Sequence, residues 1–294
     1  MSDHKQGGHH HGGGHHHHHG DDFDWERMAD SLELDAAVME PLVHSIASRL
    51  DWSGVERVLD IGCGPGAISC TLARMTPDLV VLALDSSEPL LARVRARAAG
   101  EGLPDRVVTV RADLDEGLEG LHEVAGVDGV DLVWASMVVH HAADLAAGVA
   151  TVFGTLAPGG VAVMVEFGEP LEALPEDDPL VAGGAWPRYR SASADALRER
   201  LPHDPDSIEW VSLLSDAGFV DIDHSSVWVD HPAPLHDVGR RWLAMHLKRG
   251  LDSVTDRLDP ADLEAITSLL DEVPDRDDLF LKANRQVIVA RRPR

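Results

Sequence analysis

Apolar residues recur with two different periods along this chain of 294 residues. Short continuous apolar runs, which are typical of strands buried on both faces of a sheet, alternate with segments in which apolar residues return every three or four positions. The runs predict strands at Arg57–Ile61, Val80–Leu84, Val107–Val110, Val130–Ala135 and Val161–Phe167. The segments between them predict helices at Ala67–Met75, Glu88–Ala99 and Leu145–Leu156. This alternation favours an α/β fold, in which a doubly wound and mostly parallel sheet carries helices on both faces.

The segments on either side of this core are also patterned. Before the first strand, helical spacing gives a stripe that would cover one face of the sheet, formed by Leu34, Val38, Leu42, Ile46 and Leu50. After the fifth strand, the pattern predicts a helix at Ile208–Ala217 and strands at Phe219–Val229 and Gln286–Ala290. The helix before the fifth strand is expected to stop at Ala157-Pro158-Gly159-Gly160, because proline and glycine do not continue a helix.

Two long insertions interrupt the late strands. Residues 168–206 are rich in proline, glycine and acidic residues, and residues 231–282 include a helical pattern between 235 and 272. Open α/β folds bind their ligands beyond the carboxyl ends of the strands. We therefore expect residues 23–294 to form one domain, with both insertions lying over that edge of the sheet and hence over the active site.

Residues 1–22 have a different composition, with nine histidines, many glycines and no apolar core residues, so we expect them to be disordered. Histidine side chains on a flexible chain bind nickel, copper or zinc loosely. A purification tag or an idle tail explains the same composition, and the sequence leaves both explanations open. Elsewhere in the chain no metal site is expected.

The charge balance limits the possible partners. The chain has 51 acidic and 25 basic residues, a net charge of −26, and such a surface repels both nucleic-acid phosphates and anionic membranes. No apolar stretch approaches the roughly 20 residues of a membrane helix, and the start lacks the apolar core of a signal peptide. Cys63 and Cys70 lie within one motif and do not resemble a disulfide framework, so a cytoplasmic location is expected.

The most informative motif joins the first predicted strand to the helix after it. Gly62, Gly64 and Gly66 follow the strand and would allow a tight turn that approaches a bound ligand closely. Gly62-x-Gly64-x-x-Ala67 also fits the loose dinucleotide pattern, so the glycines alone do not distinguish two adenosine cofactors. Asp85 could hold a ribose diol in either case.

Three features favour a sulfonium cofactor over a nicotinamide dinucleotide. Asp60, two residues before the first glycine, would repel a pyrophosphate but suits a ligand with an ammonium and a sulfonium. Asp113, after the third strand, could accept a hydrogen bond from an adenine amino group. The segment from Trp134 to His141, after the fourth strand, has no role in a nicotinamide site.

With these residues the chain resembles the class I S-adenosylmethionine-dependent methyltransferases, over about residues 25–294. Asp60-Gly62-Gly64-Gly66 resembles their first motif, Asp85 their ribose-binding acid, and Asp113-Leu114 their adenine-binding pair. Two turns also match, Leu156–Gly160 before the fifth strand and Ala217–Phe219 before the sixth. The resemblance implies a Rossmann-like sheet of seven strands, in which the last strand inserts antiparallel between the fifth and the sixth.

The resemblance also implies a set of residues around S-adenosylmethionine. This expected set is Asp60, Gly62, Cys63, Gly64, Gly66, Asp85, Ser86, Asp113, Leu114 and Ser136. The histidine pair after the fourth strand and the two insertions look like the small-molecule branch of the family. The Asn-Pro-Pro-Tyr signature of methylases that act on nucleic-acid amino groups is missing.

Methyl transfer depends mainly on holding the acceptor in line with the methyl carbon, and a general base helps only if the acceptor loses a proton. His140 or His141 is the first candidate base, because an imidazole titrates near neutrality. Glu166 and Glu169 are the next candidates. In the insertions, Tyr189 could be a lid residue or a packing residue, and a set of histidines could line the acceptor pocket or be structural: His231, His236 and His246.

The predicted function is therefore transfer of a methyl group from S-adenosylmethionine to an oxygen, nitrogen or carbon atom of a small molecule. Two alternatives remain open at this stage. One is a regulatory protein that binds the cofactor without transfer, and the other is an NAD-dependent dehydrogenase. Neither nucleic acid nor membrane is an expected partner, and the sequence leaves the oligomeric state open.

Overall fold

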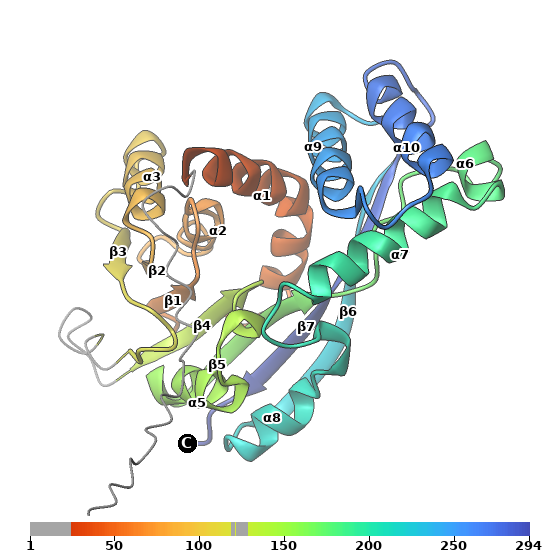
Figure 1. Ribbon diagram of the computed structural model, residues 1–294. Coiled ribbons are helices and arrows are strands. Elements are labelled where there is room, and N and C mark those ends of the chain that lie inside the picture. Colours follow the sequence, from red (N-terminus) through yellow and green to blue (C-terminus); the bar gives the residue numbers. More distant parts are fainter. Residues whose placement is uncertain (1–24, 119–120, 122–128) are drawn as a thin grey trace, which may run out of the picture.

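The computed structural model describes residues 25–118, 121 and 129–294. Its centre is a seven-stranded sheet in the order β3-β2-β1-β4-β5-β7-β6 (Figure 1). The strands are β1 (Arg57–Ile61), β2 (Val80–Asp85), β3 (Val107–Arg111), β4 (Val130–Ser136), β5 (Leu156–Phe167), β6 (Val220–His231) and β7 (Leu281–Arg291). Pairs among β1 to β5 are parallel, and β7 runs antiparallel to both β5 and β6. The predicted sheet with one late antiparallel strand is confirmed.

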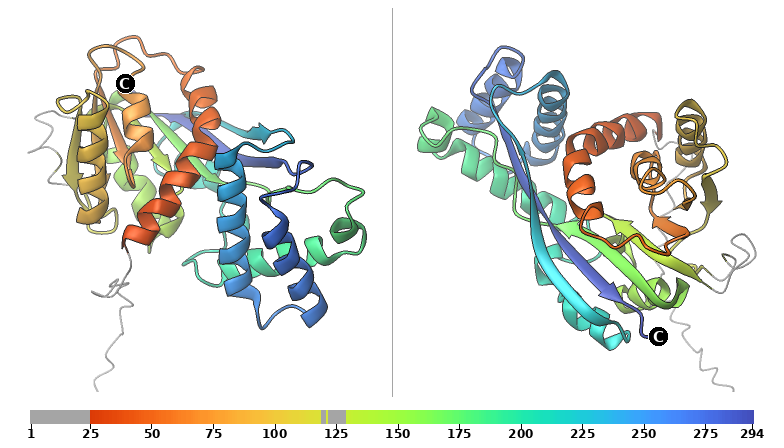
Figure 2. Two further views of the ribbon diagram at one scale, coloured as in Figure 1. Left: turned by 90° about the horizontal axis from the view of Figure 1, so that it is seen from above. Right: turned by 180° about the vertical axis from the view of Figure 1, so that it is seen from behind.

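Helices cover both faces of this sheet (Figure 2). They are α1 (Trp25–Ala47), α2 (Ala67–Leu72), α3 (Glu88–Gly100), η1 (Val139–His141), α5 (Leu145–Thr155), α6 (Pro179–Ala182), α7 (Ala185–Arg198), η2 (Pro205–Ser207), α8 (Trp210–Asp216), α9 (Asp237–Val254) and α10 (Pro260–Glu272). In the part of the chain that the structure describes, none of these helices has the length and apolarity needed to cross a membrane.

Two hydrophobic cores lie on the two faces of the sheet. Val58 and Leu59 are neighbours in β1 and fully buried, yet they belong to opposite cores, because side chains alternate along a strand. Leu42 and Ile46 of the stripe predicted before the first strand are buried in the core under α1 and α2. Val38, also from this stripe, is buried against α9 instead.

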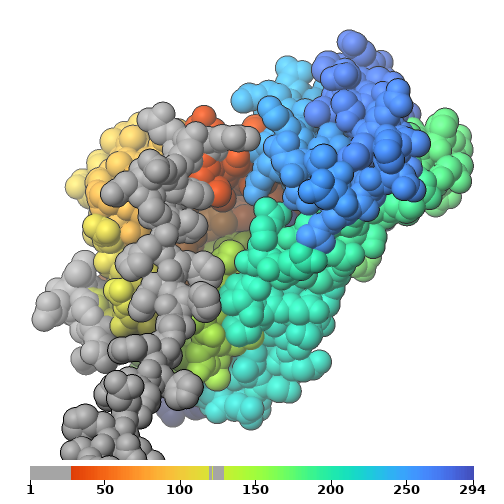
Figure 3. Space-filling view, viewed as in Figure 1, coloured from red at the N-terminus to blue at the C-terminus, as the bar shows by residue number. Residues whose placement is uncertain are grey.

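A third core holds together a cap made of α6, α7, α9 and α10. The pairing of β5 with β7 ends at Phe167 opposite Arg285, whereas β6 and β7 continue as a two-stranded ribbon to His231 opposite Leu281. The cap lies at the far end of this ribbon and forms a separate lobe in the space-filling view (Figures 1 and 3). It is therefore built from both predicted insertions, at the edge where the parallel strands end.

The two largest differences from the predicted boundaries are at the starts of β5 and β7. β5 begins at Leu156, in the segment predicted as a turn, because Leu156 pairs with Val130 before an irregularity in the register. Gly129 permits this approach, since a Cβ on it would lie 2.6 Å from the nitrogen of Ala157. β7 begins at Leu281, five residues before the predicted start at Gln286. The sequence pattern missed this first half because polar residues interrupt its apolar run.

Candidate active site

The turn between β1 and α2 has the conformation that its glycines predict. Gly62, Gly64 and Gly66 have φ angles of 66°, 54° and 83°, which other residues rarely adopt. A Cβ on Gly62 would lie 2.5 Å from Val138, in the loop after β4. At Gly64 the nearest atom to such a Cβ is in Leu32 of α1, at 3.7 Å. The turn is therefore tight at its start, and its middle glycine is buried beneath Leu32 of α1 with room for no more than ordinary van der Waals contact.

Asp85, at the end of β2, fastens this turn to the next loop. One carboxylate oxygen accepts the N–H of Gly64 at 3.0 Å, and the other accepts the N–H of Ser87 at 2.9 Å. Burial raises the pKa of Asp85, while the hydrogen bonds from Ser87 and Gly64 oppose that rise. A carboxylate held between two loops at a strand end is suitably placed for a ribose diol.

Asp60 lies behind the glycine turn. Its side chain is 1% exposed, and the hydroxyl of Ser69 in α2 donates a hydrogen bond of 2.5 Å to it. Burial raises the pKa of Asp60 to about 7, the hydrogen bond from Ser69 opposes this, and Asp85 adds to the rise. Without a cation nearby, this carboxylate carries its charge in an unfavourable environment.

Replacing Asp60 by Asn should stabilise the ligand-free protein in a pH-dependent way. Because the folded-state pKa of Asp60 lies above the ordinary 3.8, the unmodified protein keeps its full free energy of unfolding below pH 4 and loses part of it as the pH rises to about 7. D60N has no carboxyl group at this position and should not show that loss. Since one pKa unit corresponds to ~1.4 kcal/mol, even half of this shift would make D60N more stable by about 2 kcal/mol at pH 8. Urea unfolding at pH 4 and pH 8 measures this, and an equal gain at both pH values would contradict it.

The structure brings the ten predicted cofactor residues to one edge of the sheet, at the carboxyl ends of β1 to β4 and in the loops that follow. Ser86 and Asp113 are exposed there, Leu114 and Ser136 are partly buried, and Cys63 is buried within the turn. Burial raises the pKa of the Cys63 thiol well above its ordinary value. The glycine turn, with a carboxylate at each of two adjacent strand ends, fits an adenosine ligand that also carries positive charge.

Next to this edge, η1 places His140 against Glu166 of β5. The His140 Nδ1 and a Glu166 carboxylate oxygen are 2.5 Å apart, and both side chains are 1% exposed. A carboxylate only accepts hydrogen bonds, so Nδ1–H is the donor in this pair and, in the neutral imidazole, the lone pair is on Nε2. The other oxygen of Glu166, Oε1, is buried without a hydrogen-bond partner among the described residues. Such a buried polar atom requires an explanation, and a functional role is one.

The loop that leads into η1 is strained. Met137 has a φ of 55°, unusual for a residue other than glycine, and its N–H donates to the carbonyl of Val165 in β5 at 2.7 Å. Backbone conformations of this kind concentrate at functional sites. The strain lies between Ser136, predicted to contact the cofactor, and His140.

The other two candidate bases are placed differently from this pair. His141 is exposed, and its ring centroid lies 4.1 Å from that of His140. Glu169 is also exposed, and its backbone N–H donates to the side chain of Asn284 at 2.5 Å. Of the four candidates, His140 and Glu166 are the two that the fold buries together.

Several candidate residues in the insertions have structural contacts. The Tyr189 hydroxyl donates to the carbonyl of Leu247 at 3.2 Å, and burial in the cap raises its pKa to about 12. These contacts favour packing over a lid role. His231 donates to the carbonyl of Val38 at 2.9 Å, and His236 caps α9 by accepting the N–H of Gly239 at 3.1 Å.

His246 lies in α9 and, like His236, is exposed. Desolvation, together with the positive charges of Arg249 and Arg285, lowers the pKa of its ring to about 4. The neutral ring stacks on Trp242, with centroids 4.8 Å apart. Trp242 in turn donates to Asp35 of α1 at 2.6 Å.

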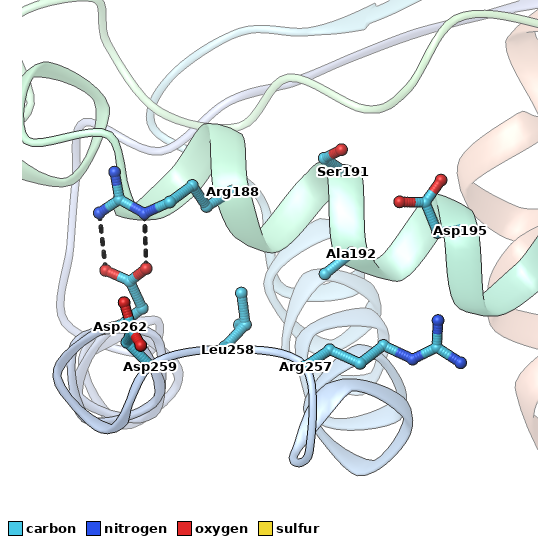
Figure 4. Close-up of a pocket in the computed structure, with 8 residues that line it drawn as sticks. All are labelled: Arg188, Ser191, Ala192, Asp195, Arg257, Leu258, Asp259 and Asp262. Carbon is cyan, nitrogen blue, oxygen red and sulfur yellow. Dashed lines mark hydrogen bonds and ion pairs between the residues drawn. The ribbon is translucent and has the colours of Figure 1, made fainter.

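Two other features lie apart from this site. A recess of about 410 Å³ opens on the cap between α7 and the connection from α9 to α10 (Figure 4), where Arg188 makes hydrogen bonds of 2.6 and 2.8 Å to Asp262. None of its lining residues belongs to the predicted site. Within the described ranges, no cluster of three or more metal-ligating side chains is present, and the histidine-rich tail lies outside those ranges.

Comparison with known proteins gives a consistent result. The sequence model of the family described as "Methyltransferase domain" matches residues 59–162, from β1 into β5. A ubiquinone/menaquinone biosynthesis C-methyltransferase of Geobacter sulfurreducens is 26% identical over 194 residues, which cover 59% of this chain and 68% of that protein. A malonyl-[acyl-carrier protein] O-methyltransferase of Dechloromonas aromatica is 27% identical over 209 residues, covering 71% of this chain and 69% of that protein.

A solved structure shares the fold over most of its length. The [4+2]-cyclase SpnF superposes with a TM-score of 0.50 and 20% identity, covering 86% of this chain and 80% of that one. The family match ends in β5, so the cap helices α6, α7, α9 and α10 lie outside it. Three observations point to the same kind of enzyme: the strand order, the glycine turn with its two carboxylates, and the similar sequences. The chain contains a methyltransferase domain at residues 59–162, it has the seven-stranded fold of the S-adenosylmethionine-dependent methyltransferases to which it is similar, and its cofactor is S-adenosylmethionine.

Proposed function

We propose that this enzyme methylates a small acceptor at an atom that loses a proton, a hydroxyl oxygen fitting best, with His140 as the general base. The buried pair of His140 and Glu166 carries this proposal. A carboxylate that holds Nδ1–H orients the imidazole and stabilises the imidazolium that forms when Nε2 takes a proton. An acceptor without a transferable proton would need no such pair.

The ten residues at the edge of the sheet are proposed to bind the cofactor. Asp85 would bind the ribose hydroxyls, Asp113 with Leu114 the adenine, and Asp60 would compensate the positive charge from behind the turn. When bound, S-adenosylmethionine supplies an electrophilic methyl group and leaves as S-adenosylhomocysteine. The turn and the loop after β4 then set the position from which the acceptor is methylated.

The proton balance of the reaction follows from the pair. As the bond from the acceptor oxygen to the methyl carbon forms and the bond from carbon to sulfur breaks, the hydroxyl proton moves to Nε2 of His140. Glu166 remains ionised and keeps Nδ1–H in place, so the charge of the imidazolium is compensated inside the protein. The proton then passes from His140 to water after the product leaves.

The proposed function is tested by incubating the protein with methyl-labelled cofactor and deproteinised cell extract, followed by separation of the labelled products. We expect label in at least one small molecule as a methyl ether. Calorimetry with S-adenosylhomocysteine should show binding in the same preparation. Binding without transfer to any fraction would favour the alternative of a cofactor-binding regulatory protein.

A further inference from the structure

One face of α9 turns towards α1 and carries a defined set of side chains. Trp242, His246 and Arg249 are spaced four and three residues apart, so they share that face. Trp242 is 3% exposed and bonded to Asp35 of α1, and the exposed ring of His246 stacks on it at an angle of 15°. We refer to Asp35, Trp242, His246 and Arg249, together with Arg285, as the α9 cluster.

The α1 helix links this cluster to the cofactor turn. Leu32 approaches Gly64, and Asp35 lies three residues further on, which places it on a neighbouring position of the same helix face. Both helices pack together in the two views of Figure 2. The cluster is therefore connected through Asp35 to the helix, α1, whose Leu32 approaches the glycine turn.

The β-sheet links the cluster to the proposed base. Arg285 of β7 is the register partner of Phe167, the last residue of β5, and neighbouring strands are ~4.8 Å apart. The ring of Phe167 lies 4.6 Å from that of His140. His140, Phe167 and Arg285 thus form a row along the edge of the sheet. If a small molecule placed its hydroxyl at His140, a second group on it could reach past Phe167 to Arg285, at the other end of this row.

The two arginines of the cluster have unused binding capacity. Among the described residues, neither Arg249 nor Arg285 forms an ion pair, although Arg188 and Arg276 in the cap pair with carboxylates. Arg285 donates to the backbone carbonyl of Asn284 at 2.9 Å. Burial lowers its pKa, with Asp35 and Glu166 opposing. A partly buried guanidinium without a carboxylate partner is unfavourable unless a ligand supplies one.

Asp35 does not fill that role. Its carboxylate accepts the hydrogen bond of Trp242, and burial raises its pKa against the influence of Trp242, Arg249 and Arg285. It lies within electrostatic reach of Arg285 without contacting it. This arrangement holds the indole in place and leaves the guanidinium of Arg285 available.

We propose that the acceptor carries a carboxylate group, which Arg285 binds at the α9 cluster while the hydroxyl to be methylated lies at His140. This inference rests on the proposed function and names the substrate class of the same site. A guanidinium matches a carboxylate with two parallel hydrogen bonds, and Arg249 adds a second positive charge. Since the carboxylate binds away from the methyl group, the product keeps its negative charge.

The labelled products of cell extract, separated by anion exchange, test this inference. We expect the label in an anionic product that resists mild alkali and phosphatase. Label only in neutral or cationic products would overturn the inference and leave methyl transfer itself intact. An alkali-labile ester would overturn it too, because the carboxylate would then be the acceptor, and phosphatase sensitivity would assign a phosphate instead. No label in any fraction would count against the proposed function.

Two variants test whether Arg285 binds the carboxylate of the acceptor. Replacing Arg285 by Gln should raise KM for the purified labelled fraction about 30-fold, since a hydrogen bond between charged groups contributes about 2 kcal/mol. The affinity for S-adenosylhomocysteine should stay within about twofold, which also shows that the variant is folded. The matched control is Arg241→Gln, an exposed arginine of α9 beside this face, which should leave KM unchanged. An equal rise in KM in both variants, or none in R285Q, would overturn the assignment.

Discussion

Replacing His140 by Asn should lower kcat by about 10²- to 10⁴-fold, the usual contribution of a general base. Asparagine keeps a hydrogen-bonding group near Glu166 but cannot take up the acceptor proton at neutral pH. The affinity for S-adenosylhomocysteine should change by less than about twofold, because His140 is not one of the ten residues proposed to bind the cofactor. Single-turnover rates and calorimetry on the same preparations provide these two measurements.

Glu166 provides the second part of this prediction. E166Q can still accept a hydrogen bond from Nδ1, but it cannot compensate an imidazolium, so we expect a loss of at least about tenfold in kcat. The matched control is Glu169→Gln, which removes an exposed carboxylate three residues further along the chain. If H140N lost stability and cofactor affinity but kept kcat, the pair would only anchor η1 to β5. Equal effects of E166Q and E169Q would also contradict a specific role.

The fold was predictable because its information is local. β1 was predicted at Arg57–Ile61 and is found there, since a fully buried parallel strand is a continuous apolar run. The two insertions were recognised by their composition, and their helices form the cap. The boundaries of β5 and β7 were missed because tertiary contacts decided them. Leu156 joins the sheet through Val130, and the polar first half of β7 is held by its pairing with β6.

The site was predictable only where a motif is contiguous in sequence. The glycine turn, Asp85 and the histidine pair each come directly after a predicted strand. Because parallel strands end at the same edge of the sheet, the sequence pattern alone places these residues together. Asp35 and Arg285 were missed, because α1 and β7 are far apart in the chain and neither residue stands in a recognisable motif. The signal that could have drawn attention to Arg285 is its position as a charged residue directly before the predicted strand Gln286–Ala290. The pairing of His140 with Glu166, each a separate candidate, also required the fold.

Replacing Asp85 by Ala should weaken the binding of S-adenosylhomocysteine by about 100-fold, which corresponds to one or two lost hydrogen bonds to a charged group. The carboxylate has two tasks. It is the proposed partner of the ribose hydroxyls, and it already accepts the N–H groups of Gly64 and Ser87. Alanine would therefore remove ligand contacts and also leave two loop N–H groups without their acceptor, so the glycine turn would lose part of its fixed geometry.

The two tasks can be separated with a second substitution and a control. Asp85→Asn keeps one acceptor oxygen, so it should lose about tenfold in affinity and retain more of the loop geometry. Asp78→Ala removes an exposed aspartate near the opposite end of β2 and should leave affinity unchanged. Calorimetry with S-adenosylhomocysteine measures all three variants. If D85A bound as tightly as the unmodified protein, Asp85 would not contact the cofactor, and the proposed placement of the cofactor at the turn between β1 and α2 would be wrong.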